Sequence, residues 1–347
     1  MKIIIDDKIP YIKEAAEKIA EEVIYAPGKD FTRKLVQDAD ALIIRTRTHC
    51  NRELLEGSKV KFIATATIGF DHIDTEYCKQ AGIEWANAPG CNSASVAQYI
   101  QSSLLIWKSL RNKKPDELTI GIIGVGNVGS KVAKVAQDFG MRVLLNDLPR
   151  EEKEGNITFT SLEKIAEECD IITFHVPLYK EGKYKTLHLA DQSFFRSLKR
   201  SPIIINTSRG EVIETNALLE ALENGLISDA VIDVWENEPD INLTLLNKVF
   251  IGTPHIAGYS ADGKANATRM SLDSLCQHFD IQADYRIVPP EPENPMITAT
   301  TETEAYLQMY DPRRDSEALK QHPELFEKLR GDYPLRREKT AFRVVIS

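Results

Sequence analysis

Three short stretches of the sequence hold side chains that can move a proton and bind an anion. They are residues 206–210, 233–239 and 253–259, and each follows a run rich in β-branched residues. His255 is the type of side chain that accepts a proton near neutral pH and returns it. Arg209 offers a planar fork that matches a carboxylate better than a lysine does. These residue types suit acid–base chemistry on an anionic substrate.

A glycine-rich turn between a strand-like and a helix-like run predicts a dinucleotide site. The apolar run 118–123 breaks into Gly124, Gly126 and Gly129 before a stretch rich in Ala, Lys and Gln. In such a turn the first glycine allows the tight bend, and the second lets a pyrophosphate approach the backbone. The third lets helix and strand pack closely, with the phosphates at the helix N-terminus.

The residue that ends the next strand-like run indicates which dinucleotide binds. Run 142–146 is followed by Asp147, which lies 18 residues beyond Gly129. A carboxylate there accepts hydrogen bonds from the ribose hydroxyls of an adenosine and repels a 2′-phosphate. NAD is therefore favoured over NADP, although Arg150 nearby leaves the second cofactor open.

Strand-like runs alternate with amphipathic stretches along most of the chain. The stretches 11–22, 93–110, 214–224 and 262–279 have helical character. Alternation of this kind predicts parallel strands joined by crossover helices. The expected strands are 2–5, 41–46, 61–65, 83–87, 118–123, 142–146, 170–176, 202–207, 229–234, 248–252 and a terminal run 342–346.

A chain of 347 residues is too long for one ordinary core and predicts more than one domain. We expect an α/β protein with two doubly wound parallel-sheet lobes, a Rossmann nucleotide lobe and a flavodoxin-like substrate lobe. Helices 93–110 and 262–279 would carry the chain between the lobes. A proline-rich linker, 288–295, precedes a small α+β segment that is expected to pack on a second subunit. The expected domains are 1–100 with 256–285 (substrate), 101–255 (NAD) and 286–347 (dimerisation).

Composition excludes several other classes of protein. A net charge of −9 argues against a broad nucleic-acid surface. The N-terminus lacks the pattern of a signal peptide, and no run is long enough to predict a membrane span. Five scattered cysteines without CxxC spacing favour a reducing cytoplasm. No His, Asp or Glu cluster has metal-ligand spacing, so no metal is predicted.

Taken together, the motifs resemble the D-2-hydroxyacid dehydrogenase family. The resemblance rests on the three stretches above, on the glycine triad with Asp147, and on TIGFDHID at 67–74 and PGCN at 89–92. FHVPL at 174–178, KTLHL at 185–189, HIAGY at 255–259 and YDPRRD at 310–315 are similar to the branch that oxidises 4-phospho-D-erythronate. The resemblance covers nearly the whole chain, including the C-terminal segment.

The resemblance implies a role for each candidate catalytic residue. Arg209 would bind and polarise the substrate's carboxylate and carbonyl, Glu238 would support His255, and His255 would act as the acid and base. The substrate contacts implied are Thr46, Thr67 and Tyr259; Arg45, Arg47, Arg313 and Arg314 are candidates for the phosphate. The cofactor contacts implied are Gly124, Gly126, Asn127, Val128, Gly129, Asp147, Val176, Thr207, Ser208, Asp233 and Gly258.

The expected reaction is NAD-dependent oxidation of 4-phospho-D-erythronate at C2 to (R)-3-hydroxy-2-oxo-4-phosphooxybutanoate, a step of pyridoxal 5′-phosphate synthesis, by a cytoplasmic homodimer. Two alternatives stay open. Another dehydrogenase of the same family, of the phosphoglycerate or hydroxypyruvate class, would share the catalytic residues. A non-catalytic NAD(H)-sensing regulator could also use this fold and retain them.

Overall fold

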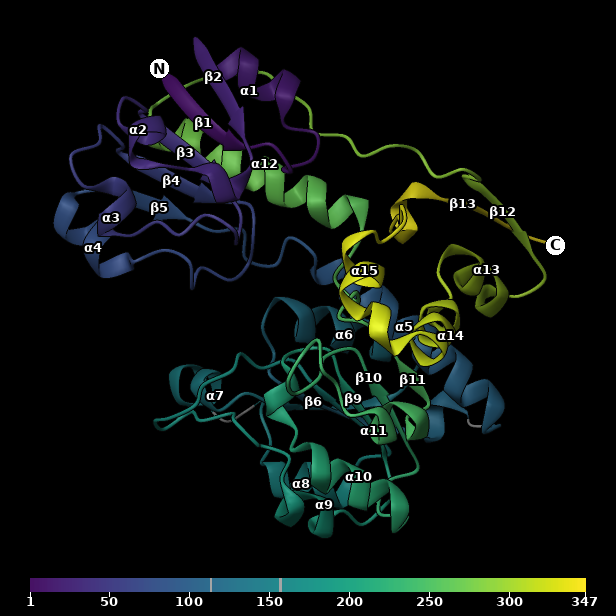
Figure 1. The fold of residues 1–347 in the computed structure, drawn as a ribbon. Coiled ribbons are helices and arrows are strands. Elements are labelled where there is room, and N and C mark those ends of the chain that lie inside the picture. Colours follow the sequence, from purple (N-terminus) through teal and green to yellow (C-terminus); the bar gives the residue numbers. More distant parts are fainter. Residues whose placement is uncertain (113, 156–157) are drawn as a thin grey trace. The chain divides into compact units, whose positions relative to one another are not determined.

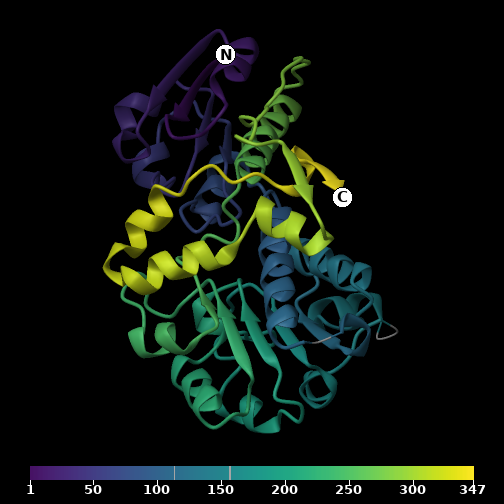
Figure 2. The same ribbon diagram turned by 90° about the vertical axis from the view of Figure 1, so that its right-hand side faces the viewer.

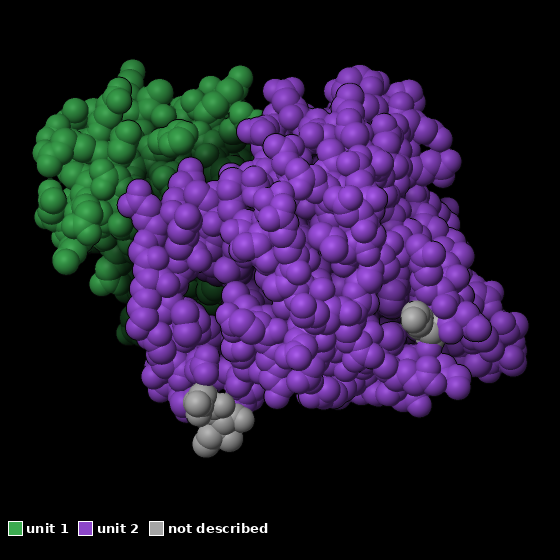
Figure 3. Space-filling model, turned by 90° about the horizontal axis from the view of Figure 1, so that it is seen from below, with its two compact units in different colours: residues 1–92, 260–291 green, residues 93–259, 292–347 purple. Residues whose placement is uncertain are grey.

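The structure, a computed structural model, describes residues 1–112, 114–155 and 158–347. The chain divides into two compact units, coloured separately in Figure 3. Unit 1 consists of Met1–Asn92 and Ser260–Glu291, and unit 2 of Ser93–Tyr259 and Pro292–Ser347. Each unit is built on a parallel sheet, which confirms the two predicted α/β lobes. The three-domain boundaries drawn from the sequence stay a prediction.

Unit 1 is a five-stranded sheet with the strand order β2-β1-β3-β4-β5 (Figure 1). All its pairs are parallel, and the order is that of flavodoxin-like folds. The strands are β1 (Lys2–Asp6), β2 (Glu22–Ala26), β3 (Ala41–Ile44), β4 (Phe62–Thr65) and β5 (Glu84–Ala86).

Side chains that alternate along the strands of unit 1 fill two separate cores. Ile3 and Ile5 pack with residues of α1 (Lys13–Ile19) and α12 (Ala261–His278). Ile4 packs on the opposite face, with residues of α2 (Arg33–Val36), α3 (Arg52–Leu55) and α4 (Thr75–Ala81). Successive side chains of a strand point to opposite faces of the sheet. A strand that is apolar throughout therefore makes both faces apolar, and helices cover both.

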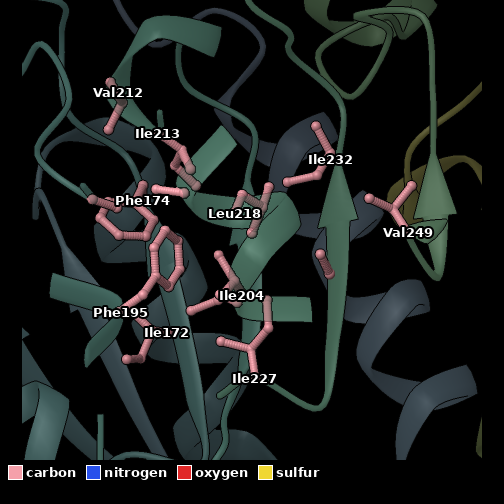
Figure 4. Close-up of a cluster of buried hydrophobic side chains, with 14 of the residues drawn as sticks. Ile172, Phe174, Phe195, Ile204, Val212, Ile213, Leu218, Ile227, Ile232 and Val249 are labelled. Atoms are coloured by element: carbon pink, nitrogen blue, oxygen red, sulfur yellow. The ribbon is translucent and has the colours of Figure 1, made fainter. Parts of the chain in front are cut away.

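Unit 2 is a six-stranded parallel sheet with the order β11-β10-β9-β8-β6-β7. Helices α5 and α6 pack on one face, and α8 to α11 on the other, where they form the apolar cluster of Figure 4. The strands are β6 (Thr119–Ile123), β7 (Arg142–Asn146), β8 (Ile171–Phe174), β9 (Ile203–Asn206), β10 (Asp229–Ile232) and β11 (Ile251–Gly252). The helices are α5 (Ser93–Leu110), α6 (Asn127–Asp138), α7 (Leu148–Glu154), α8 (Leu162–Glu168), α9 (Gln192–Ser197), α10 (Thr215–Glu223) and α11 (Leu243–Lys248).

The C-terminal segment packs largely on its own unit. Its helices α14 (Pro312–Gln321) and α15 (Phe326–Gly331), yellow in Figure 2, lie along unit 2. Leu319 and Phe326 of these helices belong to the apolar core of unit 2. The backbone amide of Gly252 in β11 donates to Ser316 Oγ at 3.0 Å. The segment comprises β12 (Met296–Ala299), α13 (Glu302–Met309), α14 (Pro312–Gln321), α15 (Phe326–Gly331) and β13 (Arg343–Ile346), and β12 pairs in parallel with β13.

Some element boundaries differ from the sequence-based expectation. The predicted helix 11–22 is shorter, because Ala20 is already extended and Glu22 begins β2. That edge strand is only half-buried, and its apolar run is short, because VIYA at 23–26 follows two glutamates and is ended by Pro27. The predicted strand 41–46 ends at Ile44, which leaves Thr46 in the following loop.

A half-buried histidine in unit 2, His175, gives stability a predicted pH dependence. The pKa of His175 is lowered by burial to about 3, and its Nε2 lies 2.9 Å from Thr173 Oγ1. The folded pKa is below the unfolded value, so the neutral ring contributes stability above about pH 6.5 that is lost as pH falls toward about 3.

We therefore expect His175→Gln to flatten the acid side of the stability curve. On going from about pH 7 to about pH 4, its Tm should fall by less than the wild-type Tm. Differential scanning calorimetry measures both. His322→Gln is the matched control, because the His322 side chain is 60% exposed. Equal acid slopes for His175→Gln and wild type would contradict the expectation.

Candidate active site

The three chemically active stretches follow neighbouring strands of unit 2. Asn206, the last residue of β9, is in register with Ile232 of β10, and Ile232 is in register with Gly252 of β11. A side chain at Gly210 would place its Cβ 2.0 Å from the carbonyl carbon of Trp235. The turn that holds Arg209 is therefore in contact with the backbone of the next stretch. Ligands bind at this edge in doubly wound sheets.

Glu238 and His255 form a hydrogen-bonded pair. His255 Nδ1 lies 2.8 Å from Glu238 Oε2, and Glu238 Oε1 accepts from the backbone amide of Trp235 at 2.9 Å. Because Nδ1–H donates a hydrogen bond to the carboxylate, Nε2 of the neutral ring is left as the proton acceptor. Burial opposes ionisation of Glu238, but its hydrogen bond to His255 and the charge of that ring hold its pKa below the usual value.

Asp233 holds the stretch that carries His255. Its carboxylate is 1% exposed and accepts from Thr253 Oγ1 at 2.6 Å and from the backbone amides of Ile256 and Ala257. Its backbone carbonyl accepts from the His255 amide at 2.8 Å. Burial raises the pKa of Asp233, and these bonds, with the charge of His255, partly oppose the rise. Asp233, expected to contact the cofactor, thus also fixes the His255 turn, where His255 has φ 57°.

Arg209 is an exposed cation at the end of β9. Its Nη1 donates to the carbonyl oxygen of Ser208 at 2.7 Å. Within the described part of the chain, no acidic side chain forms an ion pair with it. The guanidinium therefore keeps donors for an anion from outside the chain, as the predicted role requires.

The glycine-rich turn fits a dinucleotide. Gly124 has φ +89°, and a Cβ there would lie 2.6 Å from the carbonyl oxygen of His175. A Cβ on Gly129 would lie 2.0 Å from the carbonyl oxygen of Gly124. At Gly126 a Cβ would meet open space, and no side chain caps the N-terminus of α6. The backbone amides at the start of α6, including those of Asn127 and Val128, are therefore available to phosphate oxygens.

Other predicted cofactor contacts lie near this edge of unit 2. Thr207, just beyond β9, has a buried Oγ1 that makes no hydrogen bond to any described residue. Such an atom calls for a ligand partner, and the amide of a nicotinamide could supply it. Ser208 instead donates its hydroxyl to Asn206 Oδ1 at 2.8 Å. The side chain of Val176 borders Gly124, and Gly258 lies in the stretch that follows β11.

Asp147 and Arg150, the two residues that bear on the predicted choice of NAD over NADP, adjoin the glycine-rich turn. Asp147 follows β7, caps α7 by accepting from the amide of Arg150 at 3.1 Å, and accepts from the Val125 amide at 2.8 Å. The Arg150 guanidinium donates to both carboxylate oxygens of Glu154 and to the Val125 carbonyl. The charge of Arg150 is thus balanced by Glu154, which makes Arg150 less available to bind a 2′-phosphate.

We expect Asp147→Ser to raise the ratio of kcat/KM with NADP to kcat/KM with NAD about tenfold or more. The substitution removes a charge that repels the 2′-phosphate, and serine still caps the helix. Initial rates with each cofactor and cofactor binding by fluorescence titration measure the effect. Asp191→Ser is the matched control, since Asp191 caps α9 in the same way. An unchanged ratio would argue against Asp147 as the ribose ligand.

The predicted substrate residues lie in both units. Thr46 is exposed in the loop after β3, where Arg45 Nη1 donates to the Lys8 carbonyl at 3.3 Å. Thr67 follows β4 and donates its hydroxyl to the Gly69 carbonyl at 2.8 Å. Register between Ile44 and Thr65 brings these two loops to the same edge of the unit 1 sheet. Tyr259 closes the His255 stretch in unit 2. The roles of all three stay predictions.

The sequence reasoning missed a set of partners that fix this site. The hydroxyls of Tyr99, in α5, and Thr253 are hydrogen-bonded at 2.7 Å. Because Thr253 also donates to Asp233, Tyr99 extends this chain of hydrogen bonds. Arg330 in α15 reaches both Tyr259 and Glu238. Pairs separated by 71 to 154 residues leave no local signal in one sequence.

Two further observations concern the described residues only. No helix among them is long and apolar enough to cross a membrane. They also contain no group of three or more His, Cys, Asp or Glu side chains placed to hold a metal ion.

Comparisons with known proteins agree with this geometry. A family model described as the NAD-binding domain of D-isomer specific 2-hydroxyacid dehydrogenases matches residues 95–257. Erythronate-4-phosphate dehydrogenase of Bacteroides thetaiotaomicron is 85% identical over 345 residues, 99% of each chain. That of Porphyromonas gingivalis is 41% identical over 353 residues, 99% of this chain and 95% of the relative.

Solved structures of two other dehydrogenases have a similar fold. D-lactate dehydrogenase from Aquifex aeolicus, complexed with NAD and lactic acid, has a TM-score of 0.62 at 26% identity and covers 80% of this chain and 96% of its own. D-2-hydroxyisocaproate dehydrogenase has a TM-score of 0.67 at 25% identity and covers 80% and 97%. The predictions of an NAD-dependent enzyme and of its fold are confirmed. The chain belongs to the erythronate-4-phosphate dehydrogenase family of NAD-binding, D-isomer specific 2-hydroxyacid dehydrogenases.

Proposed function

We propose that this enzyme oxidises 4-phospho-D-erythronate at C2 to (R)-3-hydroxy-2-oxo-4-phosphooxybutanoate, as a step toward pyridoxal 5′-phosphate. The 85% identity to an erythronate-4-phosphate dehydrogenase over nearly the whole chain supports the substrate. The single structural observation that carries the chemistry is the 2.8 Å bond between His255 Nδ1 and Glu238, which leaves Nε2 for the substrate hydroxyl.

Three side chains divide the work in this proposal. The fork of Arg209 binds the substrate carboxylate and polarises C2–O. His255 Nε2 takes the C2 hydroxyl proton, and Glu238 stabilises the imidazolium that results. NAD, when bound, supplies the acceptor for the hydride that leaves C2 as the C=O bond forms. In the reverse direction His255 returns the proton to the carbonyl oxygen.

A substrate panel tests the proposal. Purified enzyme with NAD is given 4-phospho-D-erythronate, D-3-phosphoglycerate, D-glycerate and D-lactate, and NADH formation is followed by absorbance. The phosphorylated four-carbon acid should have the highest kcat/KM. A preference for phosphoglycerate or an unphosphorylated acid would assign the chain to another dehydrogenase class. No absorbance change with any acid would favour an NAD(H)-sensing protein.

We further propose a homodimer formed through the C-terminal segment. The pair β12–β13 carries exposed apolar side chains, namely Met296, Val344, Val345 and Ile346, which are 40% to 55% exposed. A two-stranded sheet that exposes such side chains is marginal alone and gains from a partner. Sedimentation at micromolar concentration should give twice the mass of 39.1 kDa. A single-chain mass would refute the dimer.

A cytoplasmic location completes the proposal. No disulfide joins any of the five cysteines, all of which are among the described residues, and Cys50, Cys78 and Cys169 are buried. Buried thiols outside disulfides are typical of proteins kept in a reducing compartment.

A further inference from the structure

The C-terminal segment places one arginine beside the proposed acid–base pair. Arg330, in α15, donates from Nε to Tyr259 Oη at 3.2 Å. Its Nη1 lies 3.9 Å from Glu238 Oε2, the same oxygen that bonds His255. One guanidinium thus adjoins both the predicted substrate tyrosine and the acid–base pair.

Neighbouring side chains hold Arg330 in this position. Phe326, one helical turn earlier in α15, is 1% exposed within the apolar core of unit 2. The Tyr333 ring packs edge-on against the Tyr259 ring at 6.0 Å, and Tyr333 donates to Asp315 at 2.7 Å. The arginine is therefore pre-organised, so ligand binding costs little conformational entropy at this side chain.

The guanidinium still has donors for a ligand. Its two ion-pair contacts, to Glu238 and Glu327, are both 3.9 Å long, which is too far for a hydrogen bond. Among the described residues, only Tyr259 accepts a hydrogen bond from it. The side chain is 30% exposed. Nη1 and Nη2 can therefore form a bidentate contact with an anion.

Two other arginines of the segment are already engaged. Arg313, a candidate from the sequence, makes three hydrogen bonds through its guanidinium to Asp311. Arg336 is 5% exposed, donates to backbone carbonyls including that of Ser95 at 2.7 Å, and lies over the Tyr310 ring at 3.7 Å. Arg336 thus stabilises the fold, and Arg313 is neutralised in place.

We propose that Arg330, together with Tyr259, binds the phosphate group of the substrate and so determines specificity for a phosphorylated acid. This inference rests on the proposed function. The substrate carries an anion at each end, and Arg209 is assigned to the carboxylate. A planar guanidinium fork is the group best matched to phosphate oxygens. Two long contacts to glutamates compete weakly with a phosphate at hydrogen-bond distance.

The test compares Arg330→Gln with wild type on 4-phospho-D-erythronate and on unphosphorylated D-erythronate, with kcat and KM measured separately. We expect KM for the phosphorylated acid to rise about 10- to 100-fold, the range for lost hydrogen bonds to a charged group. Its kcat should change by less than about threefold, and kcat/KM for D-erythronate by less than about twofold. Arg330→Lys should recover part of the loss. Arg313→Gln is the matched control and should resemble wild type.

Each contrary result has a distinct meaning. An equal loss on both acids, with a displaced pH profile of kcat, would show that Arg330 only positions Glu238 and Tyr259. No change on either acid would place the phosphate elsewhere. Either result overturns the inference while wild type still prefers the phosphorylated acid. If wild type lacks that preference, the proposed function itself fails, and this inference with it. Thermal unfolding of each variant shows whether a loss of activity is caused by misfolding. If Arg330→Gln misfolds, the kinetics of Arg330→Lys on the two acids decide whether Arg330 binds the phosphate.

Discussion

Replacing His255 with alanine is expected to lower kcat by about 10²- to 10⁴-fold, the usual contribution of a general base. His255 Nδ1 is committed to Glu238 at 2.8 Å, so Nε2 is the atom left for the substrate hydroxyl. NAD affinity should stay close to wild type, because the glycine-rich turn and the open N-terminus of α6 are independent of this ring. Single-turnover kinetics and fluorescence titration of NADH measure the two effects.

Unit 2 offers a matched control for this experiment. His188 also pairs with a glutamate, since its Nε2 lies 2.7 Å from Glu236 Oε1, but its side chain is 40% exposed. His188→Ala removes a histidine–glutamate pair of the same type and should leave kcat within about twofold of wild type. A loss of kcat that is equal in both variants, or absent in both, would refute the assignment of His255 as the base.

The sheets of both units could be predicted from the sequence because parallel strands buried on both faces form continuous β-branched runs. Ile203–Asn206 is such a run, and all four residues are buried. The runs missed were of another kind. The edge strand Glu22–Ala26 is half-buried, and Met296–Ala299 alternates between exposed and buried residues. Short edge strands carry a weak signal, so the prediction ended a helix at Glu22 without a strand after it and ended a linker at Pro295 without a strand after that.

The candidate site was predictable only where chemistry and position coincide in one stretch. His255 and Glu238 each follow a strand, and neighbouring parallel strands bring their C-terminal ends together. The buried role of Asp233 could not be read in advance, because an acid after a strand is usually a ligand contact. Its partners Thr253, Ile256 and Ala257 become visible only once the loop is folded. Arg330 is separated from Tyr259 by 71 residues and has no motif of its own.

Replacing Arg209 with methionine is expected to lower kcat/KM by about 10²- to 10⁴-fold, because the variant loses two charge-assisted hydrogen bonds to the substrate carboxylate. Arg209→Lys should regain only part of this, since a point charge cannot reproduce the fork. Steady-state kinetics with the phosphorylated acid measure both variants. The larger effect should be on kcat/KM, because binding and polarisation of the substrate are lost together.

Arg200 provides the matched control, because it precedes the same strand that Arg209 follows. Its Nε pairs with Asp170 at 3.3 Å at the opposite end of β9, away from the edge where ligands bind. Arg200→Met removes the same charge and a similar volume, and should change kcat/KM by less than about twofold. If the two variants behave alike, the net charge of the unit is what attracts the substrate. If Arg209→Lys equals wild type, Arg209 acts as a simple charge and not as a bidentate clamp on the carboxylate.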